Sequence, residues 1–162
     1  MYQTGHYGAA LLAYAPLGFV VAAAGFRSLA LVGGALALAL AMVPDWDTKI
    51  PVVDHRGPTH TVWFAVLVAG VVAAGGFVLA QPRGIVTALA LAGFAFLVGF
   101  VTICSHIAAD SITPMGVTPF TPVSDRHITY DVVPAKHTVA NYLLLVSGLV
   151  ATAGAFGLAQ LV

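Results

Sequence analysis

Residues 85–110 read IVTALALAGFAFLVGFVTICSHIAAD, and this stretch decides the fold class. No charged side chain precedes His106, so the apolar run reaches the roughly 20 residues with which a helix crosses the hydrocarbon core of a bilayer. His106 and Asp110 follow at its carboxyl end. Ionisable groups at the edge of an apolar bundle are costly to keep there, and for that reason they usually mark function.

Four further apolar runs repeat this pattern along the chain. We predict five helices, at about residues 7–26, 29–43, 60–79, 85–109 and 138–162. The turns at residues 27–28 and 81–84 are so short that each must join two antiparallel helices. The predicted fold class is therefore all-α: a polytopic transmembrane bundle of about five helices, which forms a single integral-membrane domain over residues 1–162.

The composition leads to the same class of protein. The chain is 60% hydrophobic and only 7% charged, whereas about 25% of the residues in a soluble domain are charged. So few charges cannot form a water-facing shell, and the lipid bilayer is the predicted partner. The net charge of +0 leaves no basic surface for nucleic acid. We expect the single cysteine, Cys104, to be a buried packing residue.

The histidines and acidic residues gather near the ends of the predicted helices. They are His6, then Asp45, Asp47, Asp54, His55 and His60, then His106, Asp110, Asp125, His127, Asp131 and His137. If the helices alternate in direction, these ends all fall on one side of the membrane. Because histidine and aspartate are the side chains that divalent metals prefer, we predict a metal site with polar loops on that membrane face.

Spacing selects the metal ligands within these groups. His106 and Asp110 are four residues apart, so they point the same way from one helix. The predicted ligands are His6, His55, His60, His106 and Asp110. Each has a simpler alternative: a buried hydrogen-bonded pair for His106 and Asp110, a histidine among lipid headgroups for His6 and His60, and an ordinary loop residue for His55.

Two loops flank the predicted site. Asp45 and Asp47 are two residues apart between Pro44 and Pro51, a spacing that suits a non-helical segment, and we expect at least one of them to be functional. The alternative is that they only end the preceding helix. Residues 113–122 form a proline-rich loop that could cover the site as a lid, because irregular backbone is excluded from lipid.

Four short motifs carry a resemblance to a known family. They are HYxA from residue 6, PDxD from residue 44, HRGxTH from residue 55 and SHxxxDxxTxxG from residue 105. Together they resemble the LexA-regulated, YdjM-type family of inner-membrane metal-dependent hydrolases. That family is in turn distantly similar to zinc-dependent phospholipase C.

The resemblance implies roles for several residues. His60, His106 and Asp110 would hold one zinc ion, and Asp110 would bridge to a second near His6. Asp45 or Asp47 would be the general base. The phospholipase pattern uses a glutamate for a third zinc, and this chain has no glutamate, so we expect one or two divalent ions, most simply Zn²⁺.

The predicted function is that of a membrane-bound hydrolase of the phosphoesterase type. Metal-activated water would cleave a phosphoester in a lipid or lipid-linked small-molecule substrate. Arg56 is the predicted phosphate ligand because its planar fork matches phosphate oxygens, with Arg126 and Lys136 as weaker candidates. His127 is predicted to protonate the leaving group, although a solvated loop position explains His127 equally simply.

Two other functions remain open from the sequence. A small ion or proton transporter would also carry intramembrane acids, but it would need them near the middle of the bilayer. A non-catalytic scaffold would use the metal only to brace its loops. The site face carries Lys49, Arg56, Arg126 and Lys136 against Arg27 and Arg83 on the other, which favours a cytoplasmic site in the cell membrane.

Overall fold

Five long helices make up most of the structure, a computed structural model that describes residues 1–162. They are α1 (Gln3–Ala23), α2 (Arg27–Leu40), α3 (Val62–Ala80), α4 (Ile85–Ser111) and α5 (Thr138–Leu158). Short 3₁₀ turns lie at η1 (Pro44–Lys49), η2 (Pro58–His60) and η3 (Gln81–Arg83). No strand is present beyond one isolated bridge between Val117 and Ile128. The predicted all-α class and the number of helices are confirmed.

All five helices are long and apolar enough to cross a membrane, with α2 and η1 counted together as Arg27–Lys49. Large apolar side chains along them face outward, among them Leu67, Val86 and Val150. A bundle whose outer surface is apolar has lipid as its natural solvent. The structure thus supports the membrane class that the composition predicts.

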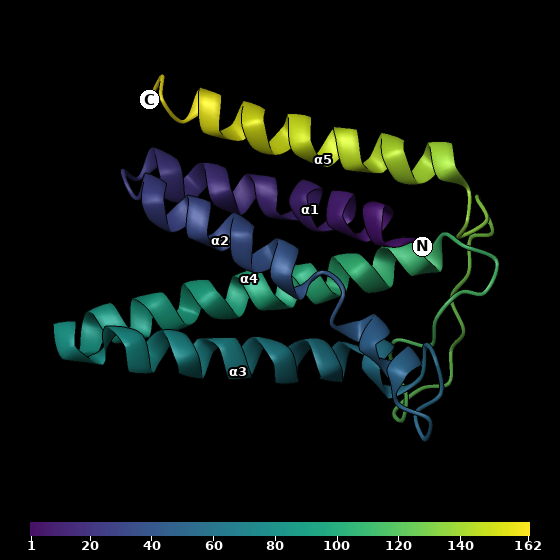
Figure 1. Ribbon diagram of the computed structural model, residues 1–162. Coiled ribbons are helices and arrows are strands. Elements are labelled where there is room, and N and C mark those ends of the chain that lie inside the picture. Colours follow the sequence, from purple (N-terminus) through teal and green to yellow (C-terminus); the bar gives the residue numbers. More distant parts are fainter.

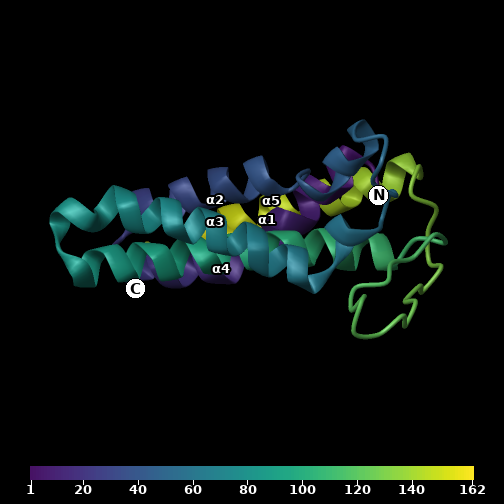
Figure 2. The same cartoon turned by 90° about the horizontal axis from the view of Figure 1, so that it is seen from below.

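The helices form two hairpins with a fifth helix along one side (Figure 1). α1 pairs with α2, and α3 with α4, while α5 lies against α1 and α1 against α4. The N-terminus and both long loops lie at one end of the bundle, and the C-terminus and the two tight turns lie at the other (Figures 1 and 2). The predicted gathering of polar helix ends on one side is therefore confirmed.

Glycines allow α1 and α5 to approach closely. A Cβ atom on Gly148 would lie 2.3 Å from the carbonyl oxygen of Gly8, and one on Gly8 would lie 2.3 Å from the backbone of Leu144. Small residues at such crossings let helix backbones touch inside a membrane. The start of α1 also packs against the end of α4, where Ala9 and Ala109 belong to one buried apolar group.

The loop between α4 and α5 folds back against α4. The backbone N–H groups of Tyr130 and Val132 donate to the carbonyls of Ser111 and Ile112 at 2.8 and 2.9 Å. The Val62 N–H donates to the Pro119 carbonyl at 2.9 Å, which ties this loop to the start of α3. The loop therefore lies across the polar end of the α3–α4 hairpin.

Candidate metal centre

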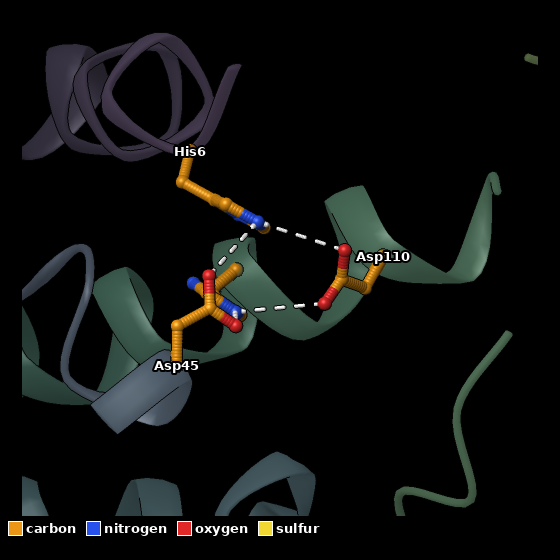
Figure 3. A group of neighbouring side chains, drawn as sticks. His6, Asp45 and Asp110 are labelled. Atoms are coloured by element: carbon orange, nitrogen blue, oxygen red, sulfur yellow. Dashed lines mark ion pairs between the residues drawn. The ribbon is translucent and has the colours of Figure 1, made fainter. Parts of the chain in front are cut away.

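Five side chains from four segments converge at the polar end of the bundle. His6 comes from the first turn of α1, Asp45 from η1, His60 from η2, and His106 and Asp110 from the last turns of α4. Four of these residues are at most 1% exposed, and the Asp45 side chain is 18% exposed. Figure 3 shows His6, Asp45 and Asp110 pointing toward one another. We call these five residues the His/Asp cluster.

The first part of the cluster has four ligand atoms: Nε2 of His60, Nε2 of His106, Oδ1 of Asp45 and Oδ2 of Asp110. His60 Nε2 lies 3.2, 3.4 and 3.3 Å from the His106, Asp45 and Asp110 atoms respectively. His106 Nε2 lies 3.3 Å from the Asp45 atom and 3.6 Å from the Asp110 atom. Ligands about 2.0–2.1 Å from a tetrahedral zinc ion stand about 3.3 Å apart. The separations of the two histidine nitrogens from each other and from the carboxylate oxygens are therefore close to those that such an ion requires.

The second part of the cluster uses the remaining carboxylate oxygens. His6 Nε2 lies 3.7 Å from Asp45 Oδ2 and 3.6 Å from Asp110 Oδ1. It also lies 3.1 Å from the carbonyl oxygen of Met1, whose amino group contacts Asp110. Asp45 and Asp110 thus each turn one oxygen toward His60 and His106 and the other toward His6.

The histidine rings are held so that Nε2 faces the cluster. His106 Nδ1 donates to the Ala41 carbonyl at 2.7 Å. The Thr59 hydroxyl donates to Asp47 at 2.7 Å and lies 3.0 Å from His60 Nδ1, so it can accept the proton of that nitrogen. Metal-binding histidines usually donate their second N–H in this way, which leaves the metal-facing nitrogen unprotonated.

Asp47 lies behind the cluster and not in it. Its side chain is 0% exposed and accepts hydrogen bonds from the Thr59 hydroxyl and from the Arg56 N–H at 3.1 Å. The other oxygen lies 2.9 Å from His55 Nδ1. Asp45 and Asp47 are two residues apart, yet only Asp45 enters the cluster, while Asp47 holds the residues around it.

The local electrostatics favour a cation. Burial lowers the pKa of His60, but the negative charges of the neighbouring Asp110 and Asp45 carboxylates oppose this and raise it above its ordinary value. Asp110 Oδ2 and His6 Nδ1 are buried without a hydrogen-bond partner. A buried carboxylate oxygen without a donor is costly, so the residues present fit a bound divalent ion.

The other predicted site residues lie around or outside the cluster. His55 is 39% exposed at its rim, and the Arg56 guanidinium pairs with Asp110 at 2.8 Å. His127 is exposed on the loop beside Gly116 and makes no hydrogen bond or ion pair with the cluster. His137 is used at the start of α5, where its Nδ1 accepts the Ala140 N–H at 3.2 Å.

A cavity of about 430 Å³ leads from the surface to the cluster. Its lining includes Asp45, Trp46, Lys49, His55 and Arg56. Lys49 was not among the predicted site residues, although it lies four positions after Asp45 in the same polar segment. Asp45 is the most exposed member of the cluster, so this cavity is the route by which a molecule would reach it.

The sequence profile described as YdjM inner membrane protein matches residues 1–162, the whole chain. The chain belongs to the YdjM inner membrane protein family. This membership confirms the resemblance drawn from the four motifs, and an inner-membrane location agrees with five apolar helices. No curated protein sequence and no solved structure matches the chain significantly. The distant likeness to phospholipase C stays a prediction.

Proposed function

We propose that the protein is a membrane-bound, metal-dependent hydrolase that cleaves a phosphoester in a lipid or lipid-linked substrate. The observation that carries the proposal is the spacing within the His/Asp cluster. Three Nε2 atoms and both oxygens of Asp45 and of Asp110 meet at 3.2–3.7 Å in a buried site. A purely structural set of polar residues has no need for this arrangement.

Zinc is the ion that suits these ligands best, because imidazole and carboxylate groups at tetrahedral spacing are its usual environment. We assign His60, His106, Asp45 and Asp110 to one ion. We assign His6 to a second, with Asp45 shared between the two. Bound divalent ions of this kind supply an activated water nucleophile at neutral pH and polarise the bond that is cleaved.

His55 is the residue to which we assign proton transfer. Its Nδ1 lies 2.9 Å from Asp47 Oδ1, and a carboxylate in that position orients an imidazole ring. One of its ring nitrogens lies within 4.8 Å of the ligand atoms of Asp45 and His60. His55 therefore stands where the cavity meets the cluster, closer to the chemistry than His127.

Lys49 and the aromatic rim of the cavity indicate the kind of substrate. Lys49 is the exposed cation of the lining, and a phosphate needs such a group. Trp46 and Tyr2 are 55% and 56% exposed at the same cavity. Aromatic residues of this kind are typical of the level of lipid headgroups. We infer that the phosphate of a lipid enters here, on the cytoplasmic side that the basic residues favour.

The position of the cluster argues against the transporter alternative. All five members lie at one end of the bundle, and α3 and α5 contain no charged residue along their lengths. A path for ions needs polar groups near the middle of the bilayer. Hydrolysis of a phosphoester separates the hydrolase from the scaffold alternative.

Metal content and hydrolysis test the proposal together. Elemental mass spectrometry of the detergent-purified protein should find zinc, and the His106→Ala/Asp110→Ala double variant should lack it. Vesicles or mixed micelles of phosphatidylglycerol, phosphatidic acid and prenyl phosphates should yield products with the zinc-loaded wild type only. Bound zinc without hydrolysis of any probe would favour the scaffold, and failure to take up zinc would refute the metal centre itself.

A further inference from the structure

Arg56 is buried between three segments of the chain. Its side chain is 8% exposed. Nη2 donates to Asp110 Oδ1 at 2.8 Å, while Nη1 donates to the Thr113 hydroxyl at 2.9 Å and to the Gly116 carbonyl at 3.1 Å. One guanidinium therefore connects the HRGxTH loop, the last turn of α4 and the turn that follows α4.

The backbone of Arg56 takes part in the same arrangement. Its φ of 62° lies in the left-handed region, which non-glycine residues rarely adopt. Such conformations persist where surrounding contacts hold them, and they gather at functional sites. Here the backbone N–H donates to Asp47 Oδ2 at 3.1 Å. Arg56 thus holds Asp47 with its main chain and Asp110 with its side chain.

The contacts of Arg56 select one oxygen of Asp110. The guanidinium and the Met1 amino group both contact Oδ1, whereas Oδ2 has no hydrogen-bond donor and faces His60 and His106 at 3.3 and 3.6 Å. Donors on Oδ1 limit the rotation of the carboxylate, so Oδ2 stays directed toward the two histidines. An arginine fork suits this task because it is planar and always charged.

We propose that Arg56 is a positioning residue that fixes the Asp110 carboxylate for metal binding and joins the turn at residues 113–116 to the cluster. This inference rests on the proposed metal function. It also replaces the role of phosphate ligand that the sequence predicts for Arg56. The two terminal nitrogens of Arg56 are already bonded to Asp110, Thr113 and Gly116, and Nε is buried away from the cavity surface.

Zinc affinity of the full-length protein tests the proposal. We compare metal-stripped wild type, Arg56→Ala and Arg56→Lys, with Arg83→Ala at the opposite end of the bundle as the matched control. Residues that support metal ligands typically change affinity by about 10–100-fold when removed. Arg56→Ala should show a loss of this size and Arg56→Lys a smaller one, because an ammonium keeps the charge but lacks the fork. Added guanidinium ion should partly restore the zinc affinity of Arg56→Ala.

Binding of inorganic phosphate to the zinc-saturated proteins separates positioning from substrate binding. We expect phosphate affinity to be unchanged in Arg56→Lys once zinc is saturating. Unchanged zinc affinity with lost phosphate affinity would overturn the inference and leave the metal function in place. If the wild type takes up no zinc, the proposed function fails and the inference fails with it. Circular dichroism measures whether each variant folds. If Arg56→Ala does not fold, the zinc affinity of Arg56→Lys tests the proposal.

Discussion

At the scale of single residues, the cluster separates side chains that look alike in sequence. Asp45 offers both oxygens to histidines, whereas Asp47 is buried behind them and bonded to Thr59, Arg56 and His55. The difference arises because η1 turns between the two residues. Two aspartates of one motif therefore have different positions, one in the His/Asp cluster and one in its support.

The Asp110→Asn variant tests the Asp110 carboxylate. The amide removes the negative charge while keeping nearly the same shape, so we expect the bound metal and the hydrolysis to be lost with helicity retained. Elemental analysis and circular dichroism measure these two quantities. Asp125→Asn, on the exposed loop, is the control and should keep its metal. Full metal content in Asp110→Asn would remove Asp110 from the centre.

Metal affinity should depend on pH in one direction. The Asp110 and Asp45 carboxylates raise the pKa of His60 in the metal-free protein, so protons compete with the metal already above the ordinary pKa of a histidine, about 6.5. A metal ion binds the imidazole ring of His60 only when that ring is neutral. Affinity should therefore be highest at alkaline pH and fall as the pH is lowered through the pKa of His60. Zinc titrations between about pH 8 and pH 5 measure this, and affinity that does not change would contradict it.

At the scale of elements, the centre depends on how α1 is placed. His6 reaches the cluster because α1 packs against both α5 and α4. The contact with α5 relies on Gly8 and Gly148, where the two backbones touch. The helix-to-helix contact therefore contributes to the site, although neither glycine carries any chemistry.

Gly148→Ala should destabilise the bundle. The added Cβ would lie 2.3 Å from the Gly8 carbonyl oxygen, and overpacking of this kind costs about 1–3 kcal/mol. Gly154→Ala is the matched control in the same helix, since a Cβ there meets nothing within 4 Å. Thermal unfolding in detergent should show a lower midpoint for Gly148→Ala only. Equal midpoints would mean that α5 is not packed as described.

At the scale of the whole molecule, the His/Asp cluster joins segments that are distant in sequence. Its residues come from α1, η1, η2 and α4, and Arg56 adds the turn after α4. The apolar core is divided into small groups along the helices, each with only three or four buried residues. An ion bound by the cluster would therefore add a link between the two hairpins.

Removal of the metal should lower the thermal stability of the protein. An ion that binds only the folded state stabilises it by about 2.7 kcal/mol at one hundred times its dissociation constant. We expect chelation to lower the unfolding midpoint and added zinc to restore it. The difference in unfolding midpoint between the chelated and the zinc-loaded protein should be smaller for His6→Ala than for the wild type. An identical midpoint with and without zinc in the wild type would contradict a bracing role.

Membrane orientation is testable through introduced cysteines. In a Cys104→Ala background, Ser124→Cys lies in the segment between α4 and α5 and marks the site face. Arg83→Cys lies in η3 and marks the opposite end of the bundle, where the turn between α3 and α4 is seen (Figure 1). With a cytoplasmic site, an impermeant maleimide should label Arg83→Cys in intact cells and Ser124→Cys only after lysis. The reverse pattern would place the site on the outer side.

The sequence by itself determined the membrane class, the five helices and the face on which the polar residues gather, because apolar run length and helix direction are local properties. His106 and Asp110 were also predictable as a pair, since one helix sets their spacing. Only the tertiary structure decided that Asp45 enters the cluster, that Arg56 turns toward Asp110, and that His127 stays outside. These outcomes depend on contacts between segments about 50–100 residues apart, which no local pattern encodes.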